Sequence, residues 1–448
     1  MNAPYRHQVL HADAAPLHVV IVGGGIGGLT LAQGLKQAGI SVAVYERDRT
    51  LTSRLQGYRV HINPTGSRAL LSCLPPHLFE AFDRTCGASG RAFHFLTEQM
   101  DGLLSVDLST MRDVAPESGP LRHRSVSRIT LRQVLLAGLD DVVHFGKTFV
   151  RYEERLDGRI VTHFEDGTSA EGDVLVAADG SGSRVRRQFL PDALRVDTGI
   201  TAIAGKVMLD DATRRQLAPI LLDGMAMVSA RGGKCLFIAL QQLRGASVDG
   251  IGGNDAAGDA GTHFDNTKSY LMWALGARPE QLGLADDEGL LDGEALRGRA
   301  LQAMAGWSDA FRTLVRLADA GTINTLTIRT SQPVAPWAPR RVTLIGDAIH
   351  AMTPYRGIGA NVALKDAMLL RDAFIAARDG KQPLLEAIGS YEAEMRRYGF
   401  AAVRASLQAM RQATSRNEIG RSLARLMLRT VDRLPPVKRL MTRRMGNE

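Results

Sequence analysis

Three short apolar runs along the chain each end directly at glycine or aspartate. They cover residues 18–22, 173–178 and 341–345 and consist largely of aliphatic residues. Apolar runs of this length that end at turn-forming residues are typical of strands buried on both faces of a parallel sheet. A fourth run, residues 41–45, predicts one more such strand, and the set indicates an α/β fold.

Glycines with the spacing GxGxxG follow the first run, at Gly23, Gly25 and Gly28. A helix is expected over residues 29–38, and the next strand ends at Glu46. In such a unit the helix N-terminus binds the pyrophosphate of a dinucleotide, and an acid roughly 20 positions after the first glycine binds a ribose hydroxyl. The dinucleotide contacts predicted from this segment are Gly23, Gly25, Ile26, Gly27, Gly28, Glu46 and Arg47.

The pattern between and after these runs predicts antiparallel strands and more helices. Residues 144–176 contain short strand-like runs separated by turn residues, and residues 198–276 contain four further runs. We therefore expect an antiparallel sheet in the second of these regions. A helix is expected from about Asn361, and a long helix over residues 385–412.

The second and third runs are followed by longer motifs. After residue 178 the sequence is DGSGSRVR, and after residue 345 it is GDAIHAMTPYRGIGAN. The three motifs, in this order along the chain, resemble those of the class A flavoprotein monooxygenases. This is the family of para-hydroxybenzoate and salicylate hydroxylases and tetracycline-inactivating monooxygenases. One departure is Ile358, which lies between two glycines where that family usually has glutamine.

The resemblance implies FAD as the cofactor and NAD(P)H as a transient reductant. It places Asp347 at the ribityl chain of FAD and the N-terminus of the following helix at the flavin ring. The FAD contacts that it implies beyond the first motif are Arg54, Arg128, Asp179, Gly180, Gly346, Asp347, Gly357, Ile358, Gly359, Ala360 and Asn361.

The resemblance also implies a reaction. Reduced FAD would form a C4a-hydroperoxide with O2 and hydroxylate an aromatic or polyketide-like small molecule. Pro354 and Gly357 would form a wall over the reactive edge, and His61 is a third candidate catalytic residue. The sequence does not identify the substrate-activating base. The candidates are chosen by residue type alone, and they are Arg231, His263 and Trp273.

Two alternatives to hydroxylation stay open. The same fold could carry out Baeyer–Villiger insertion, epoxidation or inactivation of an antibiotic. A protein of another class, a flavin-binding accessory protein without oxygen chemistry, would share the binding motifs, and the Ile358 departure is the one feature in its favour. The substrate, the choice of NADH or NADPH and the oligomeric state are not determined by the sequence.

The implied organisation is a discontinuous, Rossmann-like FAD-binding domain with an inserted α+β substrate domain and C-terminal helices. The predicted parts are a leader at 1–17, an FAD domain at 18–75, 120–187 and 322–395, a substrate domain at 76–119 and 188–321, and a basic helical tail at 396–448. Three cysteines, odd in number and far apart, give no disulfide framework or metal site. Without an apolar leader or a long apolar run, we expect a cytoplasmic protein with no membrane span.

The net charge of +8 is concentrated in the tail. Residues 411–448 carry ten basic and three acidic side chains, and arginines recur at every fourth position from Arg421 to Arg433, with leucines on other faces. A basic amphipathic helix on a membrane or nucleic acid would have this pattern. We favour instead a terminal helix packed on the body with a solvated arginine face, and no nucleic-acid motif accompanies it.

Overall fold

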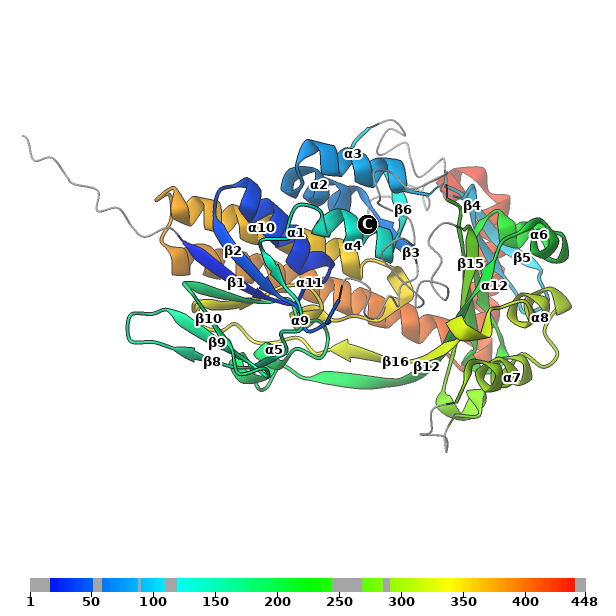
Figure 1. The fold of residues 1–448 in the computed structure, drawn as a ribbon. Coiled ribbons are helices and arrows are strands. Elements are labelled where there is room, and N and C mark those ends of the chain that lie inside the picture. The colour runs from blue at the N-terminus through cyan, green and yellow to red at the C-terminus, as the bar shows by residue number, and fades with distance from the viewer. Residues whose placement is uncertain are drawn as a thin grey trace, which may run out of the picture.

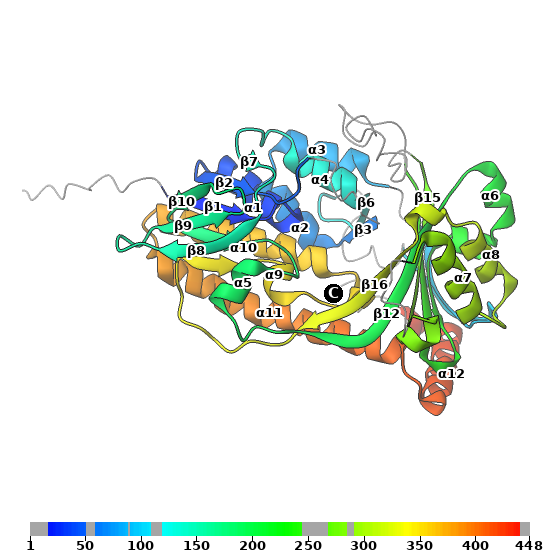
Figure 2. The same cartoon turned by 60° about the horizontal axis from the view of Figure 1, so that its bottom comes forward.

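The computed structural model describes residues 17–50, 59–87, 90–108, 119–243, 268–284 and 291–439. A parallel sheet covered by helices forms one region, and a larger sheet stands beside it (Figure 1). Two strands join the regions, β12 (Arg195–Met208) and β16 (Asn324–Ser331), and Figure 2 shows them running from one to the other.

The parallel sheet is built from the apolar runs. Its strands in spatial order are β17 (Val342–Leu344), β11 (Val174–Ala177), β1 (His18–Val22), β2 (Ser41–Tyr45) and β7 (Val143–His144). The predicted strands at residues 18–22 and 41–45 are confirmed with these bounds, and β11 and β17 are slightly shorter than their runs. Because all neighbouring pairs are parallel, the glycine and aspartate residues after β1, β11 and β17 meet at one edge.

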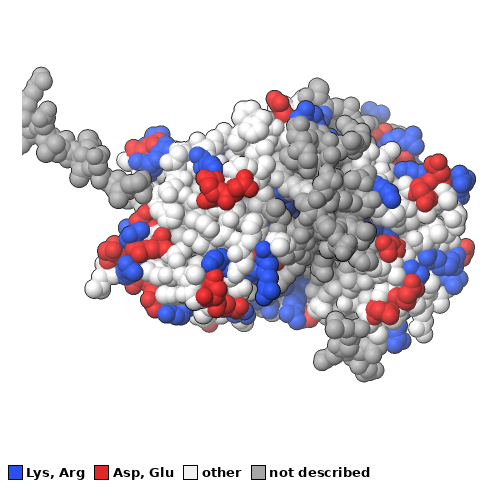
Figure 3. Space-filling model, in the orientation of Figure 1, with Lys and Arg blue, Asp and Glu red and all other residues white. Residues whose placement is uncertain are grey.

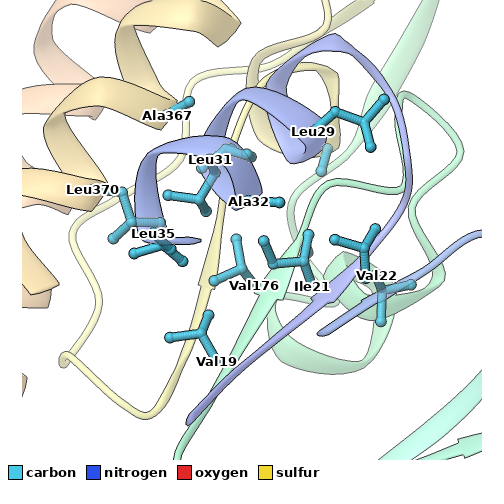
Figure 4. Packing of buried hydrophobic residues seen from close by; sticks show 14 of the residues in the cluster. Val19, Ile21, Val22, Leu29, Leu31, Ala32, Leu35, Val176, Ala367 and Leu370 are labelled. Atoms are coloured by element: carbon cyan, nitrogen blue, oxygen red, sulfur yellow. The ribbon is translucent and has the colours of Figure 1, made fainter. Parts of the chain in front are cut away.

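The first helix, α1 (Ile26–Gln37), begins three residues before the predicted start at residue 29. Gly25 is its N-cap, so the later glycines of the motif lie inside its first turn. Its leucines pack between β1 and α10 (Gly359–Arg378), as Figure 4 shows. Leu29, Leu31 and Leu35 are fully buried, and each such side chain stabilises the fold by about 1.5–3 kcal/mol.

Further helices and two small sheets complete this region. The long helix predicted over 385–412 is confirmed as α11, and α10 begins two residues before the expected start. The short antiparallel strands predicted within residues 144–176 form a three-stranded sheet. The elements are α2 (Pro64–Cys73), α3 (Pro76–Thr85), α4 (Arg128–Leu136), α5 (Arg184–Phe189), α9 (Asp347–His350), η7 (Pro354–Arg356), α11 (Leu384–Ala413), β3 (Arg59–Ile62), β6 (Arg124–Ser127), β8 (Phe149–Glu154), β9 (Ile160–Phe164) and β10 (Ser169–Gly172).

The second region is a seven-stranded sheet. Its spatial order is β16, β12, β15 (Tyr270–Ala277), β14 (Cys235–Gln241), β13 (Gly224–Ser229), β4 (Ala92–Leu96) and β5 (Gly102–Asp107). The pairs are antiparallel, as expected, except that β13 and β4 run parallel. The two strands can run parallel because β4 lies more than 100 residues before β13 and is not joined to it by a hairpin.

One face of this sheet is covered by helices, which lie on its outer side in Figures 1 and 2. A second hydrophobic core forms there, with Trp273 and Phe311 fully buried. The elements on this side are α6 (Asp211–Gln216), α7 (Gly293–Ala303), α8 (Asp309–Arg316), η2 (Pro219–Leu222), η5 (Pro279–Leu282) and η6 (Ala320–Thr322). The short helix η3 (Arg231–Gly233) lies between β13 and β14.

The helix α12 (Glu418–Arg433), near the end of the described chain, packs along the edge strand β5. Arg425 donates hydrogen bonds to the Glu98 carboxylate and the Ser229 carbonyl oxygen, so this side of the helix faces the body. The prediction that the arginine face is the solvated one is therefore wrong for Arg425. The face that points away from the body is apolar.

The described part of the chain bears on the expected membrane spans, cysteine pairing and domain boundaries. No helix there is both long and apolar enough to cross a membrane. All three cysteines are buried free thiols. The domain boundaries stay a prediction, although Leu78 and Phe82 of α3 belong to the core of the parallel-sheet region rather than to the seven-stranded sheet.

Candidate active site

The three motifs meet at the carboxyl ends of neighbouring strands. A β-carbon built on Gly23 would lie 2.3 Å from the Ala178 carbonyl oxygen, so the first and second motifs are in direct contact. The α-carbon of Gly27 faces Ile345 and Ala363, next to the third motif. Gly23 lets the two backbone segments approach more closely than any side chain would allow, whereas the space at Gly27 is that of an ordinary van der Waals contact.

The glycines of the first motif differ in what surrounds them. Gly23 has φ +113°, which requires glycine, and a β-carbon on Gly28 would lie 2.1 Å from the Gly23 carbonyl oxygen. A β-carbon on Gly25 would meet no heavy atom of the described chain within 4 Å. There is therefore open space directly over the N-terminus of α1, where free N–H groups and the helix dipole favour a phosphate.

Glu46 is held in place at the end of β2. Its carboxylate accepts hydrogen bonds from Gly24 N (2.6 Å) and Asp48 N (2.9 Å), and its side chain is buried. Each oxygen keeps a further lone pair for a ribose hydroxyl. Arg47, which follows it, is exposed.

The second motif supplies an unsatisfied carboxylate oxygen. Asp179 Oδ2 accepts from Arg184 N at 2.8 Å, whereas Oδ1 is buried and has no hydrogen-bond partner in the described chain. Desolvation raises the pKa of Asp179. Gly180, with φ +76°, makes the turn that follows, and Arg186 donates to the Ala348 carbonyl oxygen at 2.7 Å, which ties this motif to the third.

The third motif is supported by a buried ion pair that sequence reasoning missed. His350 Nε2 and Asp366 Oδ2 are 2.6 Å apart, and both side chains are fully buried. The same Asp366 oxygen accepts from Gly346 N at 2.7 Å, and Tyr398 donates to the other oxygen. This network fixes the turn that presents Asp347, whose side chain is exposed. The histidine within the GDAxH pattern was the available signal for it.

Desolvation lowers the pKa of His350, but the charge and hydrogen bond of Asp366 outweigh it and leave the pKa raised. The pair therefore favours the protonated imidazolium, whose proton lies between Nε2 and Asp366. His350 acts on the site through Gly346 and does not itself face the open space.

The N-terminus of α10 is a second helix end that points toward the motifs. Gly357, with φ +62°, is exposed, and Ile358 is the N-cap. The first-turn residues Gly359 and Ala360 are half-buried. Their N–H groups have no intrahelical acceptor, so they can bind an electron-rich edge of a ligand.

The side chain of Asn361 connects two segments of the protein, a role that its position in the motif does not predict. Its side-chain Nδ2 donates to the His61 carbonyl oxygen at 2.8 Å, and Oδ1 accepts from Asn63 N at 2.9 Å. The side chain thus joins α10 to β3 and α2, and a cofactor contact from this residue is left to its backbone.

His61 lies beside this contact. Its Nε2 is 3.1 Å from His123 Nδ1, and the two rings stack. Desolvation, the nearby charge of Arg59 and His123 lower the pKa of His61 to about 3. The ring is neutral at physiological pH, so it can orient a ligand by hydrogen bonding but does not serve as a general acid there.

The predicted FAD contacts outside the three motifs are less enclosed. Arg128 is exposed at the first position of α4, and it makes no hydrogen bond or ion pair within the described ranges. Arg54 lies outside the described residues. The nearby Arg132 donates to the Gly24 carbonyl oxygen at 3.4 Å, so α4 is anchored to the first glycine loop.

A tyrosine of the third motif reaches the seven-stranded sheet. Pro354, at the start of η7, is exposed, and Tyr355 places its hydroxyl 3.5 Å from Cys235 Sγ. A β-carbon on Gly276 would lie 2.5 Å from that hydroxyl oxygen. Sequence reasoning did not find Tyr355, although it directly follows the motif proline.

A second contact joins β14, the strand that begins at Cys235, to the parallel-sheet region. Ser125 donates to Gln241 Oε1 at 2.5 Å, and Arg59 Nε donates to Ser125 Oγ at 2.5 Å. Cys235 and Gln241 are the first and last residues of β14 and point to the same side, because side chains alternate along a strand. We call this side of the sheet the inner face.

The inner face between the two contacts is apolar and only partly covered. Strand register places the following half-buried side chains on it: Phe93, Phe95, Met225, Met227, Phe237 and Met272. Such a patch of phenylalanine and adaptable methionine is typical of a wall that binds a flat apolar ligand.

One end of the inner face is polar. Lys206 Nζ lies 4.7 Å from the centre of the Tyr270 ring, and desolvation lowers the Lys206 pKa to about 8. Desolvation likewise lowers the pKa of Arg59 to about 10. The positive charge of Arg59 and Lys206 would attract a ligand with an oxygen or anionic substituent at this end.

The two base candidates that the structure describes, Trp273 and Arg231, do not lie on this face. Trp273 is fully buried in the core on the opposite side of the sheet. Arg231 is exposed, 3.9 Å from Glu98 and near α12. His263 lies outside the described residues.

The residues of the parallel-sheet edge fit FAD. The open space over Gly25, the unsatisfied Oδ1 of Asp179 and the exposed carboxylate of Asp347 stand along one edge. The two helix N-termini offer N–H groups for a pyrophosphate and for the electron-rich edge of a flavin.

Comparison with known proteins agrees with this geometry. Residues 303–406 match the family described as an FAD binding domain, and residues 21–98 match an NAD(P)-binding Rossmann-like domain. An FAD-dependent urate hydroxylase of Klebsiella oxytoca is 30% identical over 369 residues, covering 81% of this chain and 83% of its own length. The chain therefore belongs to the family of FAD-dependent monooxygenases, whose cofactor is FAD, and the predicted family is confirmed.

Two solved structures have the same fold as this chain. A protein of Photorhabdus luminescens, provisionally described as an FAD containing monooxygenase, superposes with a TM-score of 0.78 at 33% identity over 90% of this chain and all of its own. Klebsiella pneumoniae HpxO, solved with FAD and uric acid, shares the fold with a TM-score of 0.75 at 23% identity, covering 96% of each chain.

A dual O-methyltransferase/FAD-dependent monooxygenase of Phaeosphaeria nodorum is 29% identical over 433 residues, covering 86% of this chain. This chain spans 45% of that relative's length.

Proposed function

We propose that this chain uses NAD(P)H and O2 to hydroxylate an apolar aromatic or polyketide-like small molecule that carries an oxygen substituent. The observation that carries the proposal is the inner face, a half-buried wall of phenylalanine and methionine with cations at one end. The predicted cytoplasmic location suits it, because NAD(P)H is available there. One oxygen atom enters the substrate, and the other leaves as water.

The parallel-sheet edge would hold the cofactor. The first turn of α1 would bind the pyrophosphate, Glu46 a ribose hydroxyl and Asp347 the ribityl chain. The N-terminus of α10 would favour negative charge on the flavin edge. When bound and reduced by NAD(P)H, FAD supplies the activation of O2 and the transfer of one oxygen atom.

The inner face would bind and orient the substrate. Phe237 and Met272 would exclude water from the reacting atoms, which limits wasteful release of hydrogen peroxide. Arg59 and Lys206 would hold the oxygen substituent of the ring. With a pKa of about 8, Lys206 Nζ can accept the substrate hydroxyl proton at mildly alkaline pH.

Pro354 and Gly357 would form the wall between the cofactor and the substrate. His61, neutral at physiological pH, would contribute a hydrogen bond rather than a proton. These roles follow the predicted site and are proposals for this chain.

The test is anaerobic reduction of the bound flavin by NADPH or NADH, with and without a panel of phenols and aromatic polyketides. We expect one class of compound to speed the bleaching, followed by incorporation of one atom from isotopically labelled O2. The product's structure separates hydroxylation from epoxidation or Baeyer–Villiger insertion. Absence of bleaching with every compound would contradict the proposal and favour an accessory flavoprotein.

A further inference from the structure

The outward face of α12 is an apolar stripe that nothing in the described chain covers. Four of its side chains are more than half exposed: Ile419 76%, Leu423 61%, Leu426 62% and Met427 57%. Leu434 and Val437, just beyond the helix, are also exposed. At about 3.6 residues per turn, the four positions within α12 lie on one side of the helix.

The opposite side of α12 is fixed to the body by polar contacts. Arg425 bonds to Glu98 and the Ser229 carbonyl oxygen, and Asp432 Oδ1 accepts from Ser105 N at 3.2 Å. The helix is thus held with its polar side inward and its apolar side outward, the reverse of an ordinary surface helix.

Basic side chains border the stripe. Arg429 and Arg433 are exposed and, by helical geometry, lie along one edge of it. The segment from residue 411 to 448 carries ten basic and three acidic side chains. Elsewhere charges of both signs are interspersed, as on the face shown in Figure 3.

An apolar stripe bordered by arginines matches a helix that lies in the plane of an anionic lipid surface. A second copy of the chain would bring two basic tails together, and their repulsion disfavours that occupant. A nucleic acid would use the arginines but leave the leucines in water.

We propose that α12 binds the surface of an anionic lipid bilayer, with Leu423, Leu426 and Met427 inserted among the acyl chains and Arg429 and Arg433 at the headgroups. Because α12 packs on β5, the seven-stranded sheet would lie next to the lipid. The binding surface is separate from the FAD site and does not depend on the reaction proposed above.

Cosedimentation of the FAD-loaded full chain with vesicles tests this proposal. We expect at least tenfold more binding to vesicles of equal parts phosphatidylglycerol and phosphatidylcholine than to phosphatidylcholine alone, and a strong decrease at high salt. The triple variant Leu423→Ser/Leu426→Ser/Met427→Ser should bind at least tenfold less.

Matched variants separate the two parts of the surface. Leu156→Ser removes a fully exposed leucine from the β8–β9 turn and should bind as the wild type does. Arg429→Gln/Arg433→Gln should lose most of the preference for phosphatidylglycerol. FAD content and melting temperature should stay unchanged in all variants, since the replaced side chains are exposed.

Two results would overturn the proposal. One is undiminished vesicle binding by the triple variant. The other is a wild-type dimer in light scattering that the triple variant converts to a monomer, which would assign the stripe to a second copy of the chain.

Discussion

The parallel-sheet edge and the inner face of the seven-stranded sheet meet at the same site but are built in opposite ways. The first relies on backbone: glycines that permit close approach, and helix N–H groups that need no particular side chain. The second relies on side chains from β4, β13, β14 and β15, which are distant in sequence. A fixed cofactor requires a fixed backbone, whereas a substrate wall can vary one side chain at a time.

The sharpest way to break the first region is Gly28→Ala. Its new β-carbon would lie 2.1 Å from the Gly23 carbonyl oxygen, so we expect a loss of more than about 4 kcal/mol in the free energy of unfolding. Gly25→Val is the matched control, because open space surrounds that position. It should fold with a change of about 1 kcal/mol or less yet purify with little FAD. Urea unfolding and flavin absorbance measure both, and full FAD occupancy in Gly25→Val would count against the pyrophosphate assignment.

The two faces of the second sheet should respond differently to truncation. Trp273→Ala empties the outer core and should cost about 4 kcal/mol of stability. Phe237→Ala, on the inner face, should cost about 1 kcal/mol and leave FAD content unchanged. It should raise KM for the identified substrate about tenfold. An unchanged KM for Phe237→Ala would remove the inner face from the substrate site.

The buried pair behind the third motif predicts a pH dependence of stability. His350→Asn should destabilise the protein by about 3 kcal/mol at low pH. The pKa of His350 is raised in the folded state above its ordinary 6.5, so its contribution is complete below that pH. The contribution is lost as the pH rises through the raised pKa. Urea midpoints of wild type and variant should therefore converge as the pH increases, and a constant or widening gap would show that the ion pair is not the cause.

Asp347→Ala should act on the cofactor alone. The side chain is exposed, so stability without FAD should not change. Loss of a charge-assisted hydrogen bond, about 2 kcal/mol, should weaken FAD binding roughly 30-fold. Asp192→Ala, at another exposed acid, serves as the control. Titration of the apoprotein with FAD decides the point, and equal affinities in the two variants would refute the ribityl assignment.

The smallest effect is expected at His61. With a pKa of about 3, its ring stays neutral from mildly acidic to alkaline pH. His61→Asn should therefore lower the rate less than about tenfold, through the lost hydrogen bond to His123. The shape of the pH–rate profile should not change. Disappearance of a limb of that profile in the variant would show that His61 carries a proton after all.

Prediction from sequence worked best where the chain is locally consistent. β1 and β2 have the expected bounds because their apolar runs are bounded by glycine and acid. α1 begins earlier than the sequence predicts, although Gly27 and Gly28, which have poor helix propensity, lie in its first turn. Tight packing of the helix on the strand outweighs that propensity.

Prediction failed where function depends on contacts between distant segments. Nothing local distinguishes Tyr355 as the residue that reaches Cys235, or Asp366 as the partner of His350. In the tail, the sequence correctly predicts a helix that carries arginines at every fourth position. Which side of α12 faces the body depends on the hydrogen bond from Arg425 to Glu98, more than 300 positions away.

The sequence by itself determined the family, the cofactor and the place of the three motifs, because a dinucleotide site requires glycine at points of close backbone approach and an acid at strand ends. Only the tertiary structure decided which side chains form the inner face, what the buried histidine and aspartate support, and which way α12 faces. Those features depend on burial and pairing across long sequence separations, and no local pattern encodes which distant partner a side chain will meet.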